Sequence, residues 1–539
     1  MKLKNDSVKT TGNLFKKISP VFPAFLLTFS YLFTDYHAKA AVSVPPNKLL
    51  GTLVVFWLML LPVFFIIEKV TKNRLWASIY LYLFVLTIYL SEEFFYIILI
   101  LIVAVSLAWV SAHYILVKKM AGLKHFLYIG TIIPSVIFAI IFFQVIPFYF
   151  KPDWKTYNTS MPRSTDAVRT SFPPDKTLPD IYYIVLDGYG RADILRNYYG
   201  YDNSEFINRL NKLGFVVPAN AHSNYAKTVS SLTSTLNMNY IPEVMNGVDN
   251  SLFWWQSKPF LQRSVVQLSL EQLGYKSIAI ASDWDITNNT KANIHLKPRP
   301  FHFTEFEGNL ITKSRLSLAT PLIQQAAFYP TNDSHRELIN YSFKKMSELS
   351  EMEGAKFIFA HITAPHPPFV FDEHGNSITP AYGFTFNDAN DFPGNREEYL
   401  KGYVGQLQHL NRLLEQTIEV ILSQSDTPPI IIIQADHGPG MLTDFTSLED
   451  TCLEERFSIF AAYHLPDAPP ETIPDDITPV NIFRIIFNTY FSTDLPMLDK
   501  ASYYLKDTVY VYHNENITNR LNQGVLHETC ASPPLQTQP

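Results

Sequence analysis

Cysteine is almost absent from this sequence, and so is any excess of positive charge. Only two cysteines occur among 539 residues, Cys452 and Cys530, and their wide spacing matches neither a zinc-site nor a thioredoxin-type pattern. The formal net charge is −6, and no basic stripe runs through the polar part of the chain, so nucleic-acid binding is not expected. Internal repeats are also missing.

Charged residues are scarce at the beginning of the chain, and this divides it. They make up 17% of the whole sequence, but residues up to Phe150 are mostly apolar and the remainder has ordinary globular composition. The chain is also too long for one ordinary domain. We expect four parts: a membrane part with a cytoplasmic N-terminus over 1–150, a Pro-, Ser- and Thr-rich linker over 151–178, a globular domain over 179–515 and a polar tail over 516–539.

Several apolar stretches of the membrane part are long enough to cross a bilayer, which takes roughly 20 residues. They predict a bundle of about five transmembrane helices, near residues 18–36, 49–67, 75–91, 94–117 and 126–149. Lysine and arginine gather before the first span and after the second and fourth, whereas the other connections are poor in them. By the positive-inside rule, the N-terminus is cytoplasmic and everything after Phe150 lies outside.

Some points of this topology stay open. The third span is short, and a re-entrant segment there would give an even number of crossings and a cytoplasmic domain, against the charge pattern. The first span has a long basic flank and no clear cleavage site, so we expect an anchor, not a removed signal peptide. A domain outside the cytoplasm permits a disulfide between Cys452 and Cys530, with two free thiols as the alternative.

The globular part is organised around a run of four isoleucines, residues 430–433, which is followed by Asp436-His437-Gly438. Such a run predicts a strand buried on both faces, as in the middle of a parallel sheet. Residues 181–186 form a second run of this kind, which ends at Asp187. Strand–helix alternation continues through the domain and predicts an α/β fold with a mostly parallel sheet flanked by helices.

Other segments extend this interpretation. Asp283 and Asp285 follow another predicted strand, where solvated turn residues are the favoured interpretation and ligand contacts the alternative. The stretch from about Phe371 to Asn395 is polar and aromatic without clear period, and a loop of this length is often a functional lid. Residues 403–421 have the spacing of a long amphipathic helix that leads into the isoleucine strand.

Thr228 stands at the start of a predicted helix, because Leu232 and Leu236 recur at helical spacing after it. Free backbone N–H groups and the positive end of the helix dipole favour an anion such as phosphate at that place. A Thr228 that is only an N-cap is the simpler alternative and, taken alone, the favoured one.

Polar side chains that follow predicted strands are expected to meet Thr228 at the carboxyl edge of the sheet. They are Asp187, Asp436, His437 and His366. Two carboxylates, an imidazole and a hydroxyl suit a divalent cation, and the mixed donors favour Zn²⁺ or Mn²⁺ over Mg²⁺. Bound to the cation, the threonine becomes a nucleophile near neutral pH, and His366 can stabilise charge or protonate the leaving group. Each histidine alone has a plainer explanation as a satisfied core or surface residue.

These motifs resemble the sulfatase-like branch of the alkaline phosphatase superfamily. In layout the chain is similar to lipoteichoic acid synthases and lipid A phosphoethanolamine transferases, and the resemblance covers most of residues 179–500. It implies an alkaline-phosphatase-like domain in which Asp187, Thr228, Asp436 and His437 hold one metal and His366 binds the substrate phosphate. His361 is a further substrate-binding candidate, for which the resemblance supplies no role.

The sequence departs from those relatives at two points, and it also lacks the motif of the true sulfatases. The first acid is Asp where the transferases tend to have Glu, and the segment after Asp436-His437-Gly438 lacks the later histidine of the phosphoethanolamine transferases. True sulfatases carry a Cys or Ser that is oxidised to formylglycine within a Cys-x-Pro-x-Arg type motif. No such motif surrounds either cysteine, so sulfate ester cleavage is disfavoured.

The expected protein is therefore a multi-pass protein of the bacterial inner membrane with a catalytic domain outside the cytoplasm. We expect a metal-dependent phosphotransferase with Zn or Mn, which moves a lipid-headgroup phospho-group onto an envelope lipid or glycan. The alternatives are a phosphate or sulfate ester hydrolase and a catalytically silent binding module of the same fold.

Overall fold

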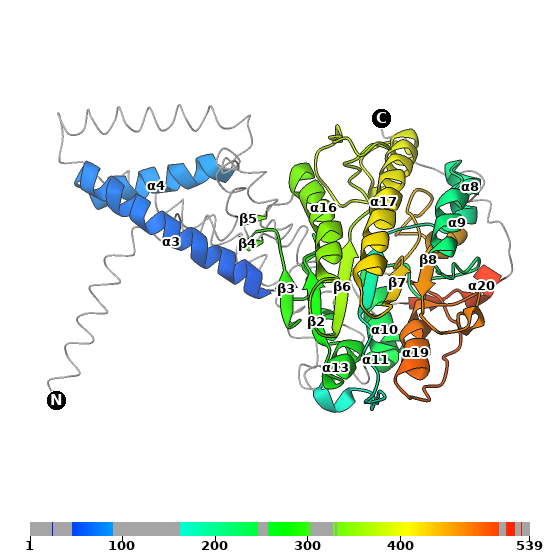
Figure 1. Cartoon of the computed structure of the whole chain (residues 1–539). Coiled ribbons are helices and arrows are strands. Elements are labelled where there is room, and N and C mark those ends of the chain that lie inside the picture. Colours follow the sequence, from blue (N-terminus) through cyan, green and yellow to red (C-terminus); the bar gives the residue numbers. More distant parts are fainter. Residues whose placement is uncertain are drawn as a thin grey trace. The chain divides into compact units, whose positions relative to one another are not determined.

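The structure is a computed structural model of the chain (Figure 1). It describes residues 24, 46–89, 162–245, 257–299, 301–302, 327–328, 331–505, 514–522 and 530. The chain divides into two compact units, one of residues 1–151 with 305–327 and one of residues 152–304 with 328–539.

Two helices are described in the first unit, α3 (Pro46–Thr71) and α4 (Arg74–Tyr89). They pack together through small and large apolar side chains such as Phe64, Ala77 and Leu81. Among the described residues, one helical stretch, Gly51–Thr71, is long and apolar enough to cross a membrane. The expected spans 94–117 and 126–149, and all but one residue of 18–36, lie outside the described residues. The bundle of five therefore stays a prediction.

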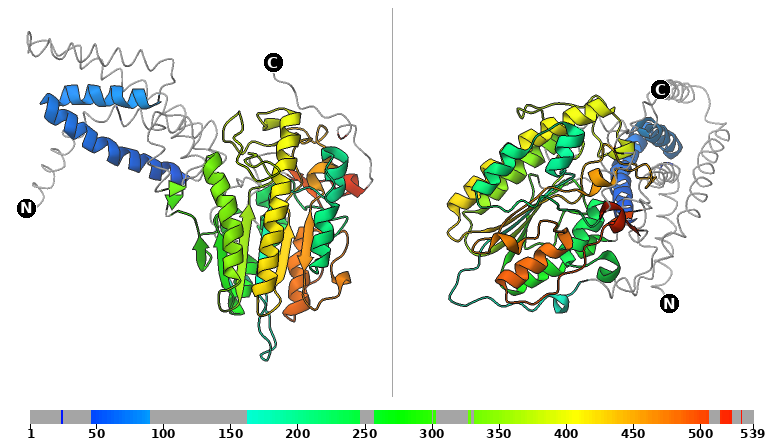
Figure 2. Two further views of the ribbon diagram at one scale, coloured as in Figure 1. Left: turned by 45° about the horizontal axis from the view of Figure 1, so that its top comes forward. Right: turned by 90° about the vertical axis from the view of Figure 1, so that its right-hand side faces the viewer.

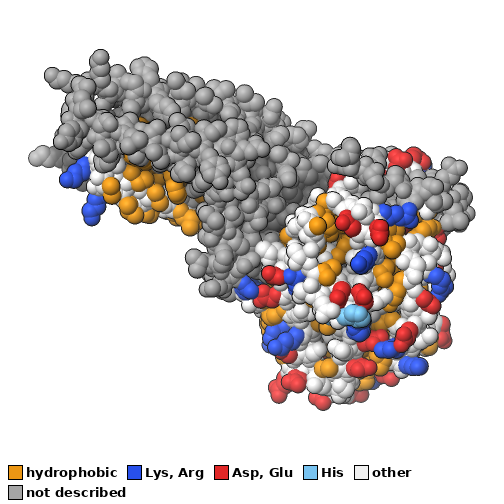
Figure 3. Space-filling view, turned by 90° about the horizontal axis from the view of Figure 1, so that it is seen from above, with side chains coloured by type: hydrophobic (Ala, Val, Ile, Leu, Met, Phe, Trp, Pro, Cys, Tyr) orange, Lys and Arg blue, Asp and Glu red, His pale blue; other side chains and the backbone are white. Residues whose placement is uncertain are grey.

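Large apolar side chains lie on the surface of this unit, as Figure 3 shows. Seven of them belong to α3, and each is between 45% and 70% exposed. Such a patch is unusual for a helix that faces water. The seven are Val54, Val55, Leu58, Met59, Phe65, Ile66 and Val70.

A six-stranded sheet forms the centre of the second unit, in the order β3-β2-β6-β1-β7-β8. Neighbouring strands pair in parallel, except that β7 and β8 are antiparallel. The mostly parallel sheet is therefore confirmed, and the isoleucine run lies in β7, which is buried throughout. The strands are β1 (Ile181–Leu186), β2 (Lys276–Ile280), β3 (Ile294–Leu296), β6 (Lys356–Ile362), β7 (Ile430–Gln434) and β8 (Ala461–His464).

Helices cover both faces of this sheet (Figures 1 and 2). One face carries α16 (Asn332–Leu349) and α17 (Arg396–Gln424), and the other carries α10 (Thr228–Asn237), α13 (Val265–Gln272) and α19 (Pro479–Tyr490). The other helices of this unit are α8 (Ala192–Tyr199), α9 (Ser204–Lys212), α11 (Ile241–Val244), α12 (Lys258–Gln262), α18 (Leu453–Phe457) and α20 (Thr518–Asn522). Short strands are β4 (Phe301–His302), β5 (Ala327–Phe328), β9 (Tyr503–Leu505) and β10 (Asn514–Asn516).

The long helix α17 forms as its sequence predicts. It begins with a capping box, in which Asn395 accepts from the backbone of Glu398 and the Glu398 carboxylate accepts in return from the backbone of Asn395. Its apolar face is buried against the sheet, and the hydroxyl of Tyr403 donates to Gly188 O at 2.9 Å and accepts from Gly190 N at 3.0 Å. The helix thereby fixes the turn that follows β1.

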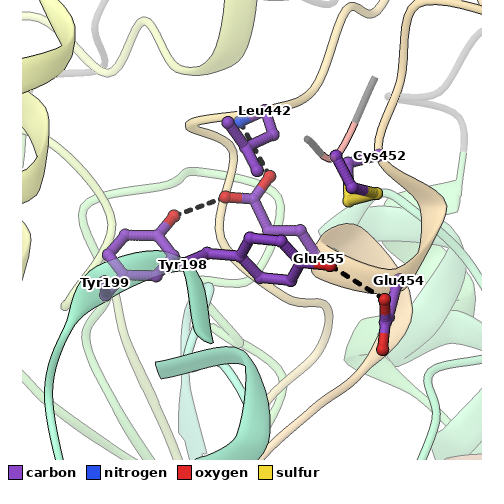
Figure 4. The surroundings of a disulfide bond; sticks show 7 residues. Tyr198, Tyr199, Leu442, Cys452, Glu454 and Glu455 are labelled. Atoms are coloured by element: carbon purple, nitrogen blue, oxygen red, sulfur yellow. Dashed lines mark hydrogen bonds between the residues drawn. A yellow bond between two sulfur atoms is a disulfide. The ribbon is translucent and has the colours of Figure 1, made fainter. Parts of the chain in front are cut away.

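Part of the expected linker lies on the globular unit. The ring of Phe172 packs on that of Phe491 with centroids 6.1 Å apart, and Ser171 N donates to Phe491 O at 3.0 Å. Cys452 and Cys530 are joined by a disulfide, which decides between the two states that the sequence leaves open. This bond adjoins α18, whose Glu455 accepts from Tyr199 and from the backbone of Leu442 (Figure 4).

Candidate active site

Three neighbouring strands bring polar residues to one edge of the sheet. Asp187 follows β1, Asp436 and His437 follow β7, and His366 lies in the turn after β6. The carboxyl ends of parallel strands share an edge, so these residues meet although they are far apart in the sequence. Gly188, with φ +73°, turns the chain directly after Asp187, and its backbone N–H donates to Asp436 Oδ1 at 3.2 Å.

Asp187, Asp436 and His437 form a compact group of metal-ligand atoms, all within 4.8 Å of one another. Both carboxylates are 0% exposed, yet both oxygens of Asp187 and Oδ2 of Asp436 have no hydrogen-bond partner. Burying unpaired charged oxygens costs several kcal/mol. These three oxygens therefore fit a divalent cation, which would satisfy them together.

The ring of His437 is oriented as a metal ligand. Its Nδ1 lies 2.9 Å from Gly438 O, to which it donates, so that the neutral ring carries a lone pair on Nε2. This Nε2 lies 3.4 Å from Asp187 Oδ1 and 3.3 Å from Asp436 Oδ2. Burial, helped by the charge of Arg456, lowers the pKa of His437 and keeps the ring neutral.

The hydroxyl of Thr228 joins this group, with Oγ1 3.1 Å from His437 Nε2. Thr228 is the first residue of α10, and the N-cap position belongs to Lys227. The simpler interpretation of Thr228 as an N-cap is therefore wrong, and its hydroxyl is directed at the candidate cation site.

Histidines surround the carboxylate of Asp187. His361, on β6, is 2% exposed, and its Nε2 lies 3.4 Å from Asp187 Oδ2 without hydrogen-bond geometry. Burial acts to raise the pKa of Asp187, but the imidazoles of His366, His361 and His437 outweigh it and lower the pKa overall. The carboxylate stays charged, as cation binding requires. In this structure His361 contacts the carboxylate, and Thr287 Oγ1 fixes its other nitrogen at 2.9 Å.

His366 lies beside the same carboxylate, and its backbone N–H donates to Asp187 O at 3.1 Å. Its Nδ1 is 2.6 Å from Pro367 O, to which it donates, so Nε2 is the nitrogen that remains for chemistry. That Nε2 lies 3.8 Å from Asp388 Oδ2. The ring also meets Trp284 edge to face, with centroids 6.0 Å apart.

Asp388 and Arg456 reach the site without having been singled out from the sequence. Arg456, on α18, lies with Nη2 3.3 Å from His437 Nε2, and its Nη1 donates to Asp388 Oδ2 at 3.1 Å. Asp388 belongs to the expected lid and also accepts from the hydroxyl of Tyr399 at 2.8 Å. Burial acts to raise the pKa of Asp388, but His366 and Arg456 outweigh it and lower the pKa.

The favoured interpretation of Asp283 as a solvated turn residue is wrong. Its side chain is buried, and Oδ2 lies 2.7 Å from His335 Nδ1 and accepts from Thr363 Oγ1 at 2.5 Å. Asp285 is half-buried and pairs with Lys258 at 2.6 Å. Neither aspartate belongs to the compact group of metal-ligand atoms.

The second unit is an alkaline-phosphatase-like α/β domain, with a mostly parallel sheet and these residues at its carboxyl edge. A family model described as Sulfatase matches residues 179–485, more than half of the chain. The chain belongs to the sulfatase family, whose members are transferases or hydrolases. No curated protein sequence matches it.

Several solved structures are similar to this chain at low sequence identity. The C-terminal periplasmic domain of EcEptC from Escherichia coli, in complex with Zn, is 10% identical with a TM-score of 0.42, covering 67% of this chain and 99% of that one. The integral membrane protein lipooligosaccharide phosphoethanolamine transferase A from Neisseria meningitidis is 12% identical with a TM-score of 0.39, covering 86% and 94%. Phosphonate monoester hydrolase of Agrobacterium radiobacter is 11% identical with a TM-score of 0.37, covering 61% and 80%. Likeness at this level carries no argument about activity.

Proposed function

We propose that this chain is a membrane-anchored, metal-dependent phosphotransferase that acts outside the cytoplasm of a bacterium through Thr228. It would move a phospho-group from a lipid headgroup onto an envelope lipid or glycan. One observation carries the proposal: the Thr228 hydroxyl lies 3.1 Å from His437 Nε2, beside the unpartnered carboxylate oxygens of Asp187 and Asp436.

Asp187, Asp436, His437 and Thr228 are the residues that would hold one divalent cation. Their mixture of oxygen and nitrogen donors favours Zn or Mn. A bound cation lowers the pKa of the hydroxyl beside it and neutralises charge that develops on the phosphoryl group.

The reaction then needs two displacements at phosphorus. Thr228 gives its proton to solvent, and its Oγ forms a bond to phosphorus as the bond to the donor's oxygen breaks. His366 enters this step as an imidazolium, because its Nδ1–H already donates to Pro367 O, and it gives the second proton, on Nε2, to that leaving oxygen. An acceptor hydroxyl next attacks the phospho-Thr228, returns its proton to His366 and releases Thr228 in its deprotonated form.

Two observations support membrane attachment: the apolar helix of the first unit and the disulfide of the second. The apolar stretch Gly51–Thr71 exposes large side chains and is followed by Lys72 and Arg74, as expected at a cytoplasmic boundary. A disulfide is typical of domains outside the cytoplasm. Attachment beside the bilayer raises the effective concentration of a lipid substrate.

Hydrolysis of a phosphate ester is the second candidate, because water can replace the acceptor in the second displacement. The segment after His437, Pro439-Gly-Met441, lacks the later histidine of the transferases that the chain resembles, and this observation favours the hydrolase. A catalytically silent binding module would form no covalent adduct at all.

The first experiment incubates the purified full-length protein with Zn or Mn and bis(p-nitrophenyl) phosphate. Mass spectrometry should find a phosphoryl adduct on Thr228, and Thr228→Ala should lose both the adduct and nitrophenol release. Thr235→Ala, further along the same helix, is the matched control and should keep both. A wild type that binds no metal and never labels would favour the binding module. Comparing envelope lipids and glycans from cells with and without the protein separates transferase from hydrolase.

A further inference from the structure

Two hydrogen-bonding groups lie close to the single lone pair on His437 Nε2. Thr228 Oγ1 lies 3.1 Å from it and Arg456 Nη2 lies 3.3 Å from it. Because Nδ1 donates to Gly438 O, the neutral ring offers only this lone pair. Once a cation uses it, the Arg456 N–H loses its acceptor close to the oxygen that we propose as nucleophile.

The guanidinium of Arg456 is held in place by its other contacts. Its Nε donates to Ala226 O at 2.9 Å, and Nη1 donates to Gly438 O and to Asp388 Oδ2, each at 3.1 Å. The side chain is only 2% exposed. The remaining nitrogen, Nη2, is therefore directed at the site and cannot turn to solvent for another acceptor.

A second basic side chain, that of Lys227, lies next to this guanidinium. Lys227 precedes Thr228, and its Nζ lies 2.8 Å from the centroid of the Phe445 ring, which the Arg456 guanidinium also faces at 5.1 Å. Asp388 pairs with Arg456, but within the described part of the chain no carboxylate lies at ion-pair distance from Lys227. On this side of Thr228, two basic side chains therefore adjoin the single carboxylate of Asp388, whereas Asp187 and Asp436 lie at the candidate cation site. Burial beside Arg456 lowers the pKa of Lys227, so the guanidinium is the permanent positive charge there and can bind an anionic oxygen.

We propose that Arg456 is a catalytic residue that binds an anionic oxygen of the transferred phospho-group, and that Asp388 is the lid residue that positions it. This inference rests on the proposed function and narrows its substrate to esters with a free anionic oxygen, such as phosphodiesters. The planar guanidinium can donate to such an oxygen from a fixed direction, which a lysine cannot reproduce.

The test titrates inorganic phosphate into the metal-loaded full-length protein by calorimetry and times the formation of phospho-Thr228. Arg456→Gln should weaken phosphate binding at least tenfold and slow adduct formation by about 10²–10³, the usual effect of losing one donor to the transition state. Asp388→Asn keeps Arg456 and Lys227 but removes the carboxylate that positions the guanidinium. Phosphate affinity should therefore be retained while adduct formation slows. Arg209→Gln, at an exposed position, is the control and should change neither.

Phosphate affinity and adduct rate at wild-type levels in Arg456→Gln would overturn the proposal. Thermal stabilisation by the metal should persist in this variant, because Arg456 is not a proposed ligand. If Arg456→Gln does not fold, Arg456→Lys decides: weakened phosphate binding supports the inference and unchanged binding refutes it. Failure of the proposed function looks different, because the wild type would then form no adduct while phosphate titration would still report on Arg456.

Discussion

Replacing Asp187 by asparagine tests the candidate cation site without changing its shape. The substitution keeps the side-chain volume and removes a charge whose two oxygens have no hydrogen-bond partner in a fully buried position. If these oxygens exist to bind a cation, the variant should lose the stabilisation that the metal gives to the folded protein.

The size of this loss follows from mass action. Metal at 100 times its dissociation constant stabilises the folded wild type by about 2.7 kcal/mol. Changes in groups that only support a ligand already weaken metal binding by roughly 10–100-fold, so losing a charged ligand should cost at least about 100-fold. At the same metal concentration the variant then gains at most about 0.4 kcal/mol. The difference corresponds to roughly 2–3 °C in Tm, at about 2.1 cal/mol/K of unfolding entropy per residue.

Calorimetry or circular dichroism of chelator-treated protein, with and without added Zn or Mn, measures the two shifts. Asp202→Asn, at the exposed start of α9, is the matched control and should show the wild-type shift. A metal-induced rise in Tm of equal size in Asp187→Asn and wild type would refute the reasoning.

Three further predictions concern other parts of the globular unit. Thr228→Ser should keep adduct formation within about tenfold by mass spectrometry, because it retains a hydroxyl at the same place; complete loss in this variant would count against an oxygen nucleophile. Cys452→Ser should lower the free energy of unfolding by about 4 kcal/mol in non-reducing denaturant titrations, because the disulfide spans 78 residues; an unchanged midpoint would contradict this. Burial raises the pKa of Glu455 from 4.5 to about 7, so the folded protein keeps a proton there that the unfolded chain releases. Stability should fall by about 2 kcal/mol between pH 5 and 7.5, and Glu455→Gln should remove this part of the dependence in urea titrations at the two pH values.

The site residues at the strand ends could be predicted from the sequence, because the apolar runs that mark these strands are local patterns. The isoleucine run before Asp436 and the apolar run before Asp187 each mark a buried strand, and adjacent parallel strands place both acids at one edge. The local sequence around Thr228 left its hydroxyl open between a cap and a ligand, and only the approach of His437 from another strand places that hydroxyl beside the candidate cation site.

Residues that reach the site through tertiary packing could not be predicted in this way. Arg456 follows no strand, and Asp388 is one of several acids in a segment without period. The burial of Asp283 depends on His335, which lies 52 positions further along the chain on α16. The pairing of Cys452 with Cys530 likewise depends on the folded path and not on spacing.

The central claim is that a cation binds against the oxygen of Thr228. Crystals of the metal-loaded protein, measured at the absorption edge of Zn or Mn, test it most directly. The account predicts one strong anomalous peak at bonding distance, about 2.0–2.3 Å, from Asp187, Asp436, His437 and the Thr228 hydroxyl. A peak elsewhere, or one beyond bonding distance of that hydroxyl, would contradict it.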